Sequence, residues 1–285
     1  MNGQPPDNSA GSHQPSLWVR SPPGDPVLTG VNWGGLKTLY IKEVRRFFKV
    51  QTQTVWAPAV TTLLFLAIFT VALGRGDRTM LGVPFGHFLA PGLVAMAMIQ
   101  NAFANSSFSL LVGKIQGTIV DYLMPPLSTG ELIAGLVAAA VTRAFLVGFA
   151  VWLAMLLWPG VSVAITHPLW ALWFGLMGSL MLSFLGVMTS IWAEKFDHAA
   201  AVTNFVVTPL ALLSGTFYAI DQLPPLFQAV SHANPFFYVI SGFRYGFIGV
   251  SDSPILVGAG LLAVLNVLLW WACYALLRSG WKIKN

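Results

Sequence analysis

The chain has 285 residues, of which 56% are hydrophobic and only 9% are charged, and its mean hydropathy is +0.71. A soluble domain carries roughly 25% charged residues, so this composition excludes a soluble protein and indicates an integral membrane protein. The formal net charge is +5, but the basic residues gather beside hydrophobic segments, as the positive-inside rule describes. We therefore expect membrane lipids as partners and no nucleic acid.

The N-terminal region divides into two parts. Residues 1 to 31 hold six of the eighteen prolines and too little apolar surface to offset the entropy of ordering, which predicts a disordered cytoplasmic tail. Residues 32 to 50 predict an amphipathic connecting helix in the membrane interface. Its apolar face comprises Leu36, Tyr40, Val44, Phe47 and Phe48, and its polar face Thr38, Lys42, Arg45 and Lys49.

Residues 51 to 285 predict a six-span transmembrane domain, because six apolar segments have about the 20 residues needed to cross a bilayer. They are residues 55–73, 88–112, 132–157, 168–192, 199–219 and 254–277. Six spans place both termini on one side. With the termini inside, eleven Lys and Arg residues are cytoplasmic and three are outside, so both termini are expected in the cytoplasm. The fold class is all-α and polytopic.

The segment between the fifth and sixth spans is apolar but interrupted. Pro224 and Pro225 suit the start of a short helix, and Asn234 followed by Pro235 predicts a turn. Each arm of about 11 residues would be about 16 Å long, roughly half the hydrocarbon thickness. We expect an outer re-entrant helical hairpin, and a lipid-facing anchor is the open alternative.

No enzyme is indicated by the residue pattern. The five histidines never have the spacing of a metal site, and no catalytic set is suggested, so we expect neither catalytic nor metal-binding residues. The stretch GVNWGGLKT fails as a phosphate loop because Leu36 separates the last glycine from the lysine. The carboxylates noted fall in loops or at span edges, whereas ion-driven carriers place ionisable groups in mid-membrane.

Three polar residues within the spans have two interpretations. Arg143 is the one charge deep in a span, and Asn101 and Asn105 form a polar stripe on the second span. Placing an arginine there costs about 2.5 to 3.5 kcal/mol, so it should face a partner or a cavity. Interhelical hydrogen bonding explains all three, and a place along the substrate path is the alternative.

Two longer stretches resemble the ABC-2 type transporter permease family. They are GKIQGTIVDYLMPPLSTGELIAG at residues 113–135 and LSGTFYAIDQLPPLFQAVSHANPFFYVISGFRYGFIGV at residues 213–250. The first resembles the family's cytoplasmic segment ending in a Pro-Leu-Ser element, and the second its outer connection with Leu-Pro, Asn-Pro, Tyr and Arg. The resemblance extends from about residue 33 to the end. One departure is the sparse KIQGTIVD, where many relatives carry an acid-rich run.

The resemblance implies the permease subunit of an ATP-driven exporter in the cytoplasmic (inner) membrane of a bacterium. A second copy and separate ATP-binding cassette subunits, which hold the ATP and Mg²⁺, are the implied partners. The implied ATPase-coupling residues are Lys114, Gln116, Asp121, Tyr122, Pro125, Pro126, Leu127 and Glu131. The candidate path or gate residues are Asn101, Asn105, Arg143, Tyr238 and Arg244.

Alternatives remain open at this point. Arg244 could bind phosphate groups of a substrate or pair with Asp221 or Asp252. An ion-coupled secondary transporter is the alternative function, and a membrane-embedded enzyme is a third.

Overall fold

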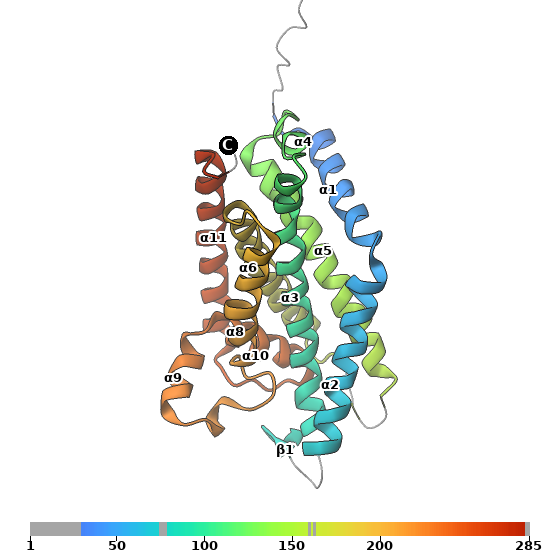
Figure 1. The fold of residues 1–285 in the computed structure, drawn as a ribbon. Helices are drawn as coiled ribbons and strands as arrows, with labels where there is room; N and C mark the ends of the chain where they lie inside the picture. Colours follow the sequence, from blue (N-terminus) through green and yellow to red (C-terminus); the bar gives the residue numbers. More distant parts are fainter. Residues whose placement is uncertain (1–29, 74–78, 159–160, 162–163, 283–285) are drawn as a thin grey trace, which may run out of the picture. The chain divides into compact units, whose positions relative to one another are not determined.

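Helices make up nearly all of the regular structure (Figure 1). The computed structural model describes residues 30 to 73, 79 to 158, 161 and 164 to 282. The predicted tail lies outside this range except for its last two residues, as do four of the basic residues counted for orientation: Arg20, Arg75, Arg78 and Lys284. The all-α prediction is confirmed. Within the described ranges, the strands are β1 (Thr79–Met80) and β2 (Val83–Pro84), which pair as a minimal antiparallel hairpin.

Five helices are long and apolar enough to cross a membrane. They are α2 (Ala57–Leu73) with the π-turn η1 (Thr52–Trp56) before it, α3 (Phe85–Ile115), α5 (Thr129–Leu156), α6 (Pro168–Trp192) and α11 (Ile255–Ser279). Each begins and ends within a few residues of a predicted span. In an apolar stretch of 18 residues, 78% of α3 is buried inside the protein, against 22% for the corresponding stretches of α11 and of the η1–α2 segment. The protein interior is therefore built around α3, which packs on α5 and α6.

The fifth predicted span is a composite helix with different bounds. It consists of α7 (Phe196–Val202), the π-turn η2 (Thr203–Val207) and α8 (Thr208–Leu212). The predicted end at residue 219 is wrong, because the chain leaves the helix after Leu212 and turns at Gly215, whose φ of +74° favours glycine. This run falls short of the length of the five spanning helices, so a sixth span stays a prediction.

Both π-turns lie just N-terminal to a proline, with one residue between. η1 ends two residues before Pro58, and η2 ends two residues before Pro209. A proline ring clashes with the carbonyl four residues earlier and has no N–H to offer it. A π-turn widens the helix at that point. Each helix can therefore continue past its proline.

The predicted hairpin is present as two helices of unequal length. α9 (Pro225–Ala233) and α10 (Pro235–Ile248) meet at Asn234, whose side-chain oxygen accepts the Phe236 amide at 3.0 Å. The Asn234 Nδ2 donates to the Leu210 carbonyl at 2.7 Å, which ties the turn to α8. α10 packs on α3, α6 and α11, so this arm is part of the helical core. Its re-entry into a membrane stays a prediction.

The predicted amphipathic helix is α1 (Trp33–Phe48), but its buried face differs from the expected one. The buried side chains are Leu39, Glu43 and Phe47, and Phe48 is 45% exposed. The buried face of α1 is the one that carries Glu43, because the Glu43 carboxylate accepts hydrogen bonds inside the protein. Residues from Asn32 onward, including α1, form one compact unit.

The compact unit has two opposite ends. The α4 end holds α4 (Val120–Leu123), the start of α1 and the end of α11, at the top of Figure 1. The α9 end holds α9 and the β hairpin, at the bottom of the same view.

Candidate functional site

The connection between α3 and α5 at the α4 end, which we call the corner, is compact and held by hydrogen bonds. Gly117 leaves α3 with a φ of +72°, and the Thr118 amide donates to the Gly113 carbonyl at 2.8 Å. α4 follows, and Ser128 then caps α5 in a capping box with Glu131. The segment from residue 114 to 127 is therefore a folded element held between two long helices.

Glu131 joins this corner to the start of α1. Its Oε2 accepts the Ser128 amide at 2.7 Å, and its Oε1 accepts the Asn32 amide at 2.6 Å. The Asn32 Nδ2 also donates to the Pro126 carbonyl at 3.1 Å, while its Oδ1 caps α1 by accepting the Gly35 amide at 2.9 Å. One carboxylate therefore completes the N-termini of two helices.

Glu43 is a buried carboxylate that connects α1, α3 and α4. Its Oε1 accepts the Tyr122 hydroxyl at 2.9 Å, and its Oε2 accepts the Ser109 hydroxyl at 2.9 Å. Arg46 Nη2 lies 2.8 Å from the same Oε2. Burial, together with the nearby Glu43 charge, raises the pKa of Tyr122 above its usual value, so this phenol stays a donor. The two carboxylate oxygens are thus satisfied without water.

A basic cavity of about 660 Å³ opens beside this network. It lies between α1 and the α3–α4 corner, and the Lys42 ammonium stands 3.7 Å from the centre of the Tyr122 ring. Four cations line it, with Glu43 and Asp121 as the acids: Lys42, Arg45, Arg46 and Lys49. Its charge suits anionic groups.

The predicted coupling residues divide into inward and outward groups. Tyr122 is buried, Pro125, Leu127 and Glu131 are partly buried, and Gln116, Asp121 and Pro126 are exposed. Lys114 does not extend into solvent freely, because its Nζ donates to the Ile191 carbonyl at the end of α6 at 2.6 Å. Around α4, four large apolar side chains are exposed, and we call them the α4 patch: Ile115, Val120, Leu123 and Met124.

Each of the three polar residues predicted within the spans has a hydrogen-bond partner on another helix. Arg143 Nη2 donates to Asn101 Oδ1 at 3.0 Å, and Arg46 Nη2 donates to the Asn105 carbonyl at 2.9 Å. Arg46 also donates to the Ser109 hydroxyl at 2.9 Å. The stripe on α3 thus faces arginines from α1 and α5.

At the α9 end, Arg244 is fully buried. Of the two acids considered, Asp252 is its partner, with Nη1 and Oδ2 2.7 Å apart. Its Nη2 donates to the Gly215 carbonyl at 2.7 Å, its Nε donates to the Phe88 carbonyl at 3.2 Å, and its guanidinium lies 3.7 Å from the Phe88 ring centre. The side chain therefore ties α10 to α3 and to two loops.

Tyr238, the other predicted gate residue, holds the helix pair together. Its hydroxyl donates to the carbonyl of His232 in α9 at 3.1 Å. It connects the two arms and does not contact Arg244 through any hydrogen bond found in the described residues.

Among the described residues, no three His, Cys, Asp or Glu side chains gather as a metal site requires.

The sequence matches the family model described as ABC-2 type transporter over residues 35–248. This chain is an ABC-2 type permease. It is thus a multi-pass membrane subunit of a transporter.

Several relatives of this permease are transport or nodulation proteins. It is 37% identical over 259 residues to the inner membrane transport permease YadH of Escherichia coli K12, covering 89% of this chain and 98% of the relative. It is 27% identical to nodulation protein J of Rhizobium leguminosarum bv. viciae, covering 86% and 95%. The nodulation protein J of Neorhizobium galegae is 28% identical, with 82% and 90% covered.

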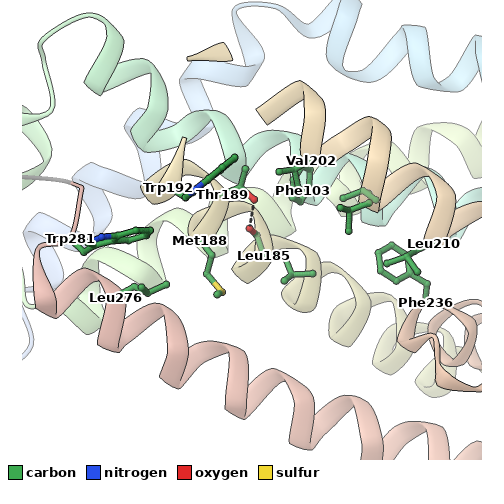
Figure 2. A pocket seen from close by; sticks show the side chains of 12 residues that line it. Phe103, Leu185, Met188, Thr189, Trp192, Val202, Leu210, Phe236, Leu276 and Trp281 are labelled. Carbon is green, nitrogen blue, oxygen red and sulfur yellow. Dashed lines mark hydrogen bonds between the residues drawn. The ribbon is translucent and has the colours of Figure 1, made fainter. Parts of the chain in front are cut away.

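The permease also has an apolar crevice of about 320 Å³ between α6, α11 and the composite helix (Figure 2). Trp192 and Trp281 lie at one end of it, and Leu210 and Phe236 lie at the other. The Thr189 hydroxyl on its wall donates to the Leu185 carbonyl at 2.8 Å. The crevice therefore offers contact to apolar groups and no free donor from that side chain.

Two residues of the site were missed by the sequence reasoning. Glu43 and Arg46 stand three positions apart on α1, and both reach inward. Glu43 lies four residues from Leu39 and four from Phe47, on what proved to be the buried face. An acid flanked at helical spacing by apolar residues was the available signal.

Proposed function

We propose that this permease is the membrane half of an ATP-driven exporter in the inner membrane of a bacterium. Two copies pair, and separate ATP-binding cassette subunits, which hold ATP and Mg²⁺, dock at the α4 end. The similarity to YadH, an inner membrane transport permease, supports the inner membrane, and the excess of basic residues toward the α4 end supports a cytoplasmic position for that end.

The α4 patch is the observation that carries this proposal. Leu123 is 42% exposed and Met124 is 77% exposed, beside the polar Gln116 and Asp121. Exposed apolar side chains rimmed by polar ones are typical of a protein-binding surface. The patch lies on the corner, so a partner that moves the patch would also move the adjoining ends of α3 and α5.

The contacts of the corner supply a route for that motion. Tyr122 of α4 is bonded to Glu43 of α1, and Glu43 to Ser109 of α3. α3 runs from this network to Phe88, whose carbonyl accepts Arg244 of α10. At 1.5 Å per residue, the 31 residues of α3 span about 46 Å. We propose that α3 carries the ATPase motion from the α4 end to the α9–α10 pair, which gates exit.

Site-specific photocrosslinking in cells tests the partnership. A crosslinker at Met124 should capture an ATP-binding cassette subunit. The control is Leu256 on α11, which is also 77% exposed but lies at the α9 end, and it should capture none. The Met124→Glu variant should lose vanadate-sensitive transport in reconstituted vesicles while keeping the melting temperature of the wild type.

Two results would contradict the proposal. One is equal capture of the ATPase from both positions, or none from Met124. The other is transport by the purified permease with an ion gradient alone, which would establish the secondary-carrier alternative.

A further inference from the structure

Three hydrogen-bond donors near the middle of α3 have no partner among the described residues. They are Arg46 Nη1 on α1, Asn105 Nδ2 on α3 and Arg143 Nε on α5, and all three atoms are buried. A buried donor left unpaired is destabilising, and more so when it is charged. Three in one region indicate an acceptor that is not part of this chain.

These donors lie within about one helical turn of each other along α3. Arg46 Nη2 is 2.9 Å from the Asn105 carbonyl oxygen, so the same guanidinium brings Nη1 to this level. Arg143 is bonded to Asn101, and side chains four residues apart on a helix are roughly 5 to 6 Å apart. Helices α1, α3 and α5 therefore direct unpaired donors to one neighbourhood.

The local charge favours an anion over a neutral acceptor. Arg46 and Arg143 donate to residues of α3 that are four positions apart, Asn105 and Asn101, and among the described residues the ion-pair partner of Glu43 is Arg46. No ion pair to Arg143 is found in the part of the chain that the structure describes. The cluster of two arginines and one glutamate thus keeps one uncompensated positive charge.

Cavities approach this neighbourhood from two sides. Arg46 lines the basic cavity of about 660 Å³ at the α4 end. Asn101 lines another of about 310 Å³, formed with Gln53, Thr61 and Gln100 between η1–α2 and α3. Two residues that neighbour the unpaired donors, Arg46 and Asn101, therefore stand in the walls of cavities.

We propose that Arg46, Asn105 and Arg143 bind a phosphate-type oxyanion. Guanidinium groups and a carboxamide N–H are donors that match phosphate oxygens, and arginine does so with a planar fork of N–H groups. The ligand is a lipid phosphodiester headgroup or a free phosphate group, since both present the same oxygens. This site does not depend on the identity of the ATPase partner.

Native mass spectrometry of the full chain in detergent tests the site. The probes are phosphatidylglycerol and inorganic phosphate, each titrated separately and then together. Arg143→Gln should weaken phosphatidylglycerol or phosphate binding about tenfold or more. The control Lys37→Gln removes an exposed cation of α1 and should leave the affinity within about twofold, as expected for a screened surface charge.

A second variant separates binding from folding. Asn105→Asp places a carboxylate among the two arginines, so it should raise the melting temperature of the ligand-free chain and abolish anion binding. Displacement of bound lipid by inorganic phosphate would identify free phosphate as a sufficient ligand. Retention of the lipid would identify the lipid phosphodiester.

The proposal is overturned if the wild type binds neither probe, which is also the result expected if an acidic segment of a partner fills the site. It is equally overturned if Asn105→Asp or a folded Arg143→Gln binds like the wild type.

Discussion

Replacing Glu43 by glutamine should weaken the joint between α1, α3 and α4. The carboxylate accepts hydrogen bonds from Tyr122 and Ser109 and balances the charge of Arg46. A glutamine keeps the shape, but its NH₂ group can only donate, so one face of it would meet other donors. Comparison of this variant with the wild type therefore measures what the negative charge and the second acceptor oxygen of Glu43 contribute to stability.

The expected loss is about 2 to 4 kcal/mol of unfolding free energy. Each hydrogen bond to a charged group contributes about 1.5 to 3 kcal/mol, and one of the two hydroxyls keeps an acceptor. Removing one member of a buried ion pair costs about 3 to 5 kcal/mol. The Arg46 side chain is 28% exposed and can reach water, which places the loss toward the lower values.

Equilibrium unfolding in mixed micelles with increasing sodium dodecyl sulfate measures this loss through the fluorescence of the 11 tryptophans. The control Asp121→Asn removes an exposed acid of the same cavity and should change stability by about 0.5 kcal/mol or less. A double-mutant cycle with Tyr122→Phe should show a coupling of at least about 1 kcal/mol. Additive effects, or equal losses in Glu43→Gln and Asp121→Asn, would refute the reasoning.

Three further outcomes follow from the contacts. Because burial and the Glu43 charge raise the pKa of Tyr122, its folded-state proton persists above pH about 10, where the unfolded chain releases it; unfolding free energy should fall with rising alkaline pH more steeply in the wild type than in Tyr122→Phe. Asp252→Asn should cost about 3 to 5 kcal/mol in a micelle unfolding titration, since Arg244 is left buried without its counter-ion, and adding Arg244→Met should recover part of that loss. Gly246→Ala should lower the melting temperature because its new Cβ would lie 2.5 Å from backbone in α6, whereas Gly260→Ala on α11 meets nothing within 4 Å and should be neutral or stabilising.

The long helices could be predicted because hydropathy is a local property. The apolar runs of α3, α5, α6 and α11 each predict a span without reference to the rest of the chain. Asn234 followed by Pro235 likewise predicts the turn between α9 and α10. The end of the composite helix could not be found this way, because apolar residues such as Leu213 and Phe217 continue beyond Leu212. A backbone reversal at Gly215 ends the helix there.

The candidate site was only partly visible in the sequence. Asn101, Asn105 and Arg143 stood out because polar residues are rare in spans. Glu43 did not stand out, since an acid on an amphipathic helix is ordinary. Its partners Ser109 and Tyr122 are 66 and 79 positions away, and no local pattern encodes such a distance.

The double cap made by Glu131 has a consequence for biosynthesis. The backbone amide of Asn32 finds its acceptor 99 positions later in the chain. During translation, therefore, the start of α1 leaves the ribosome before the acceptor of its hydrogen bond has been synthesised. The contact between Asn32 and Glu131 can form only after the first turn of α5 has left the ribosome, so this end of α1 is fixed in place only after α2 and α3 have been synthesised.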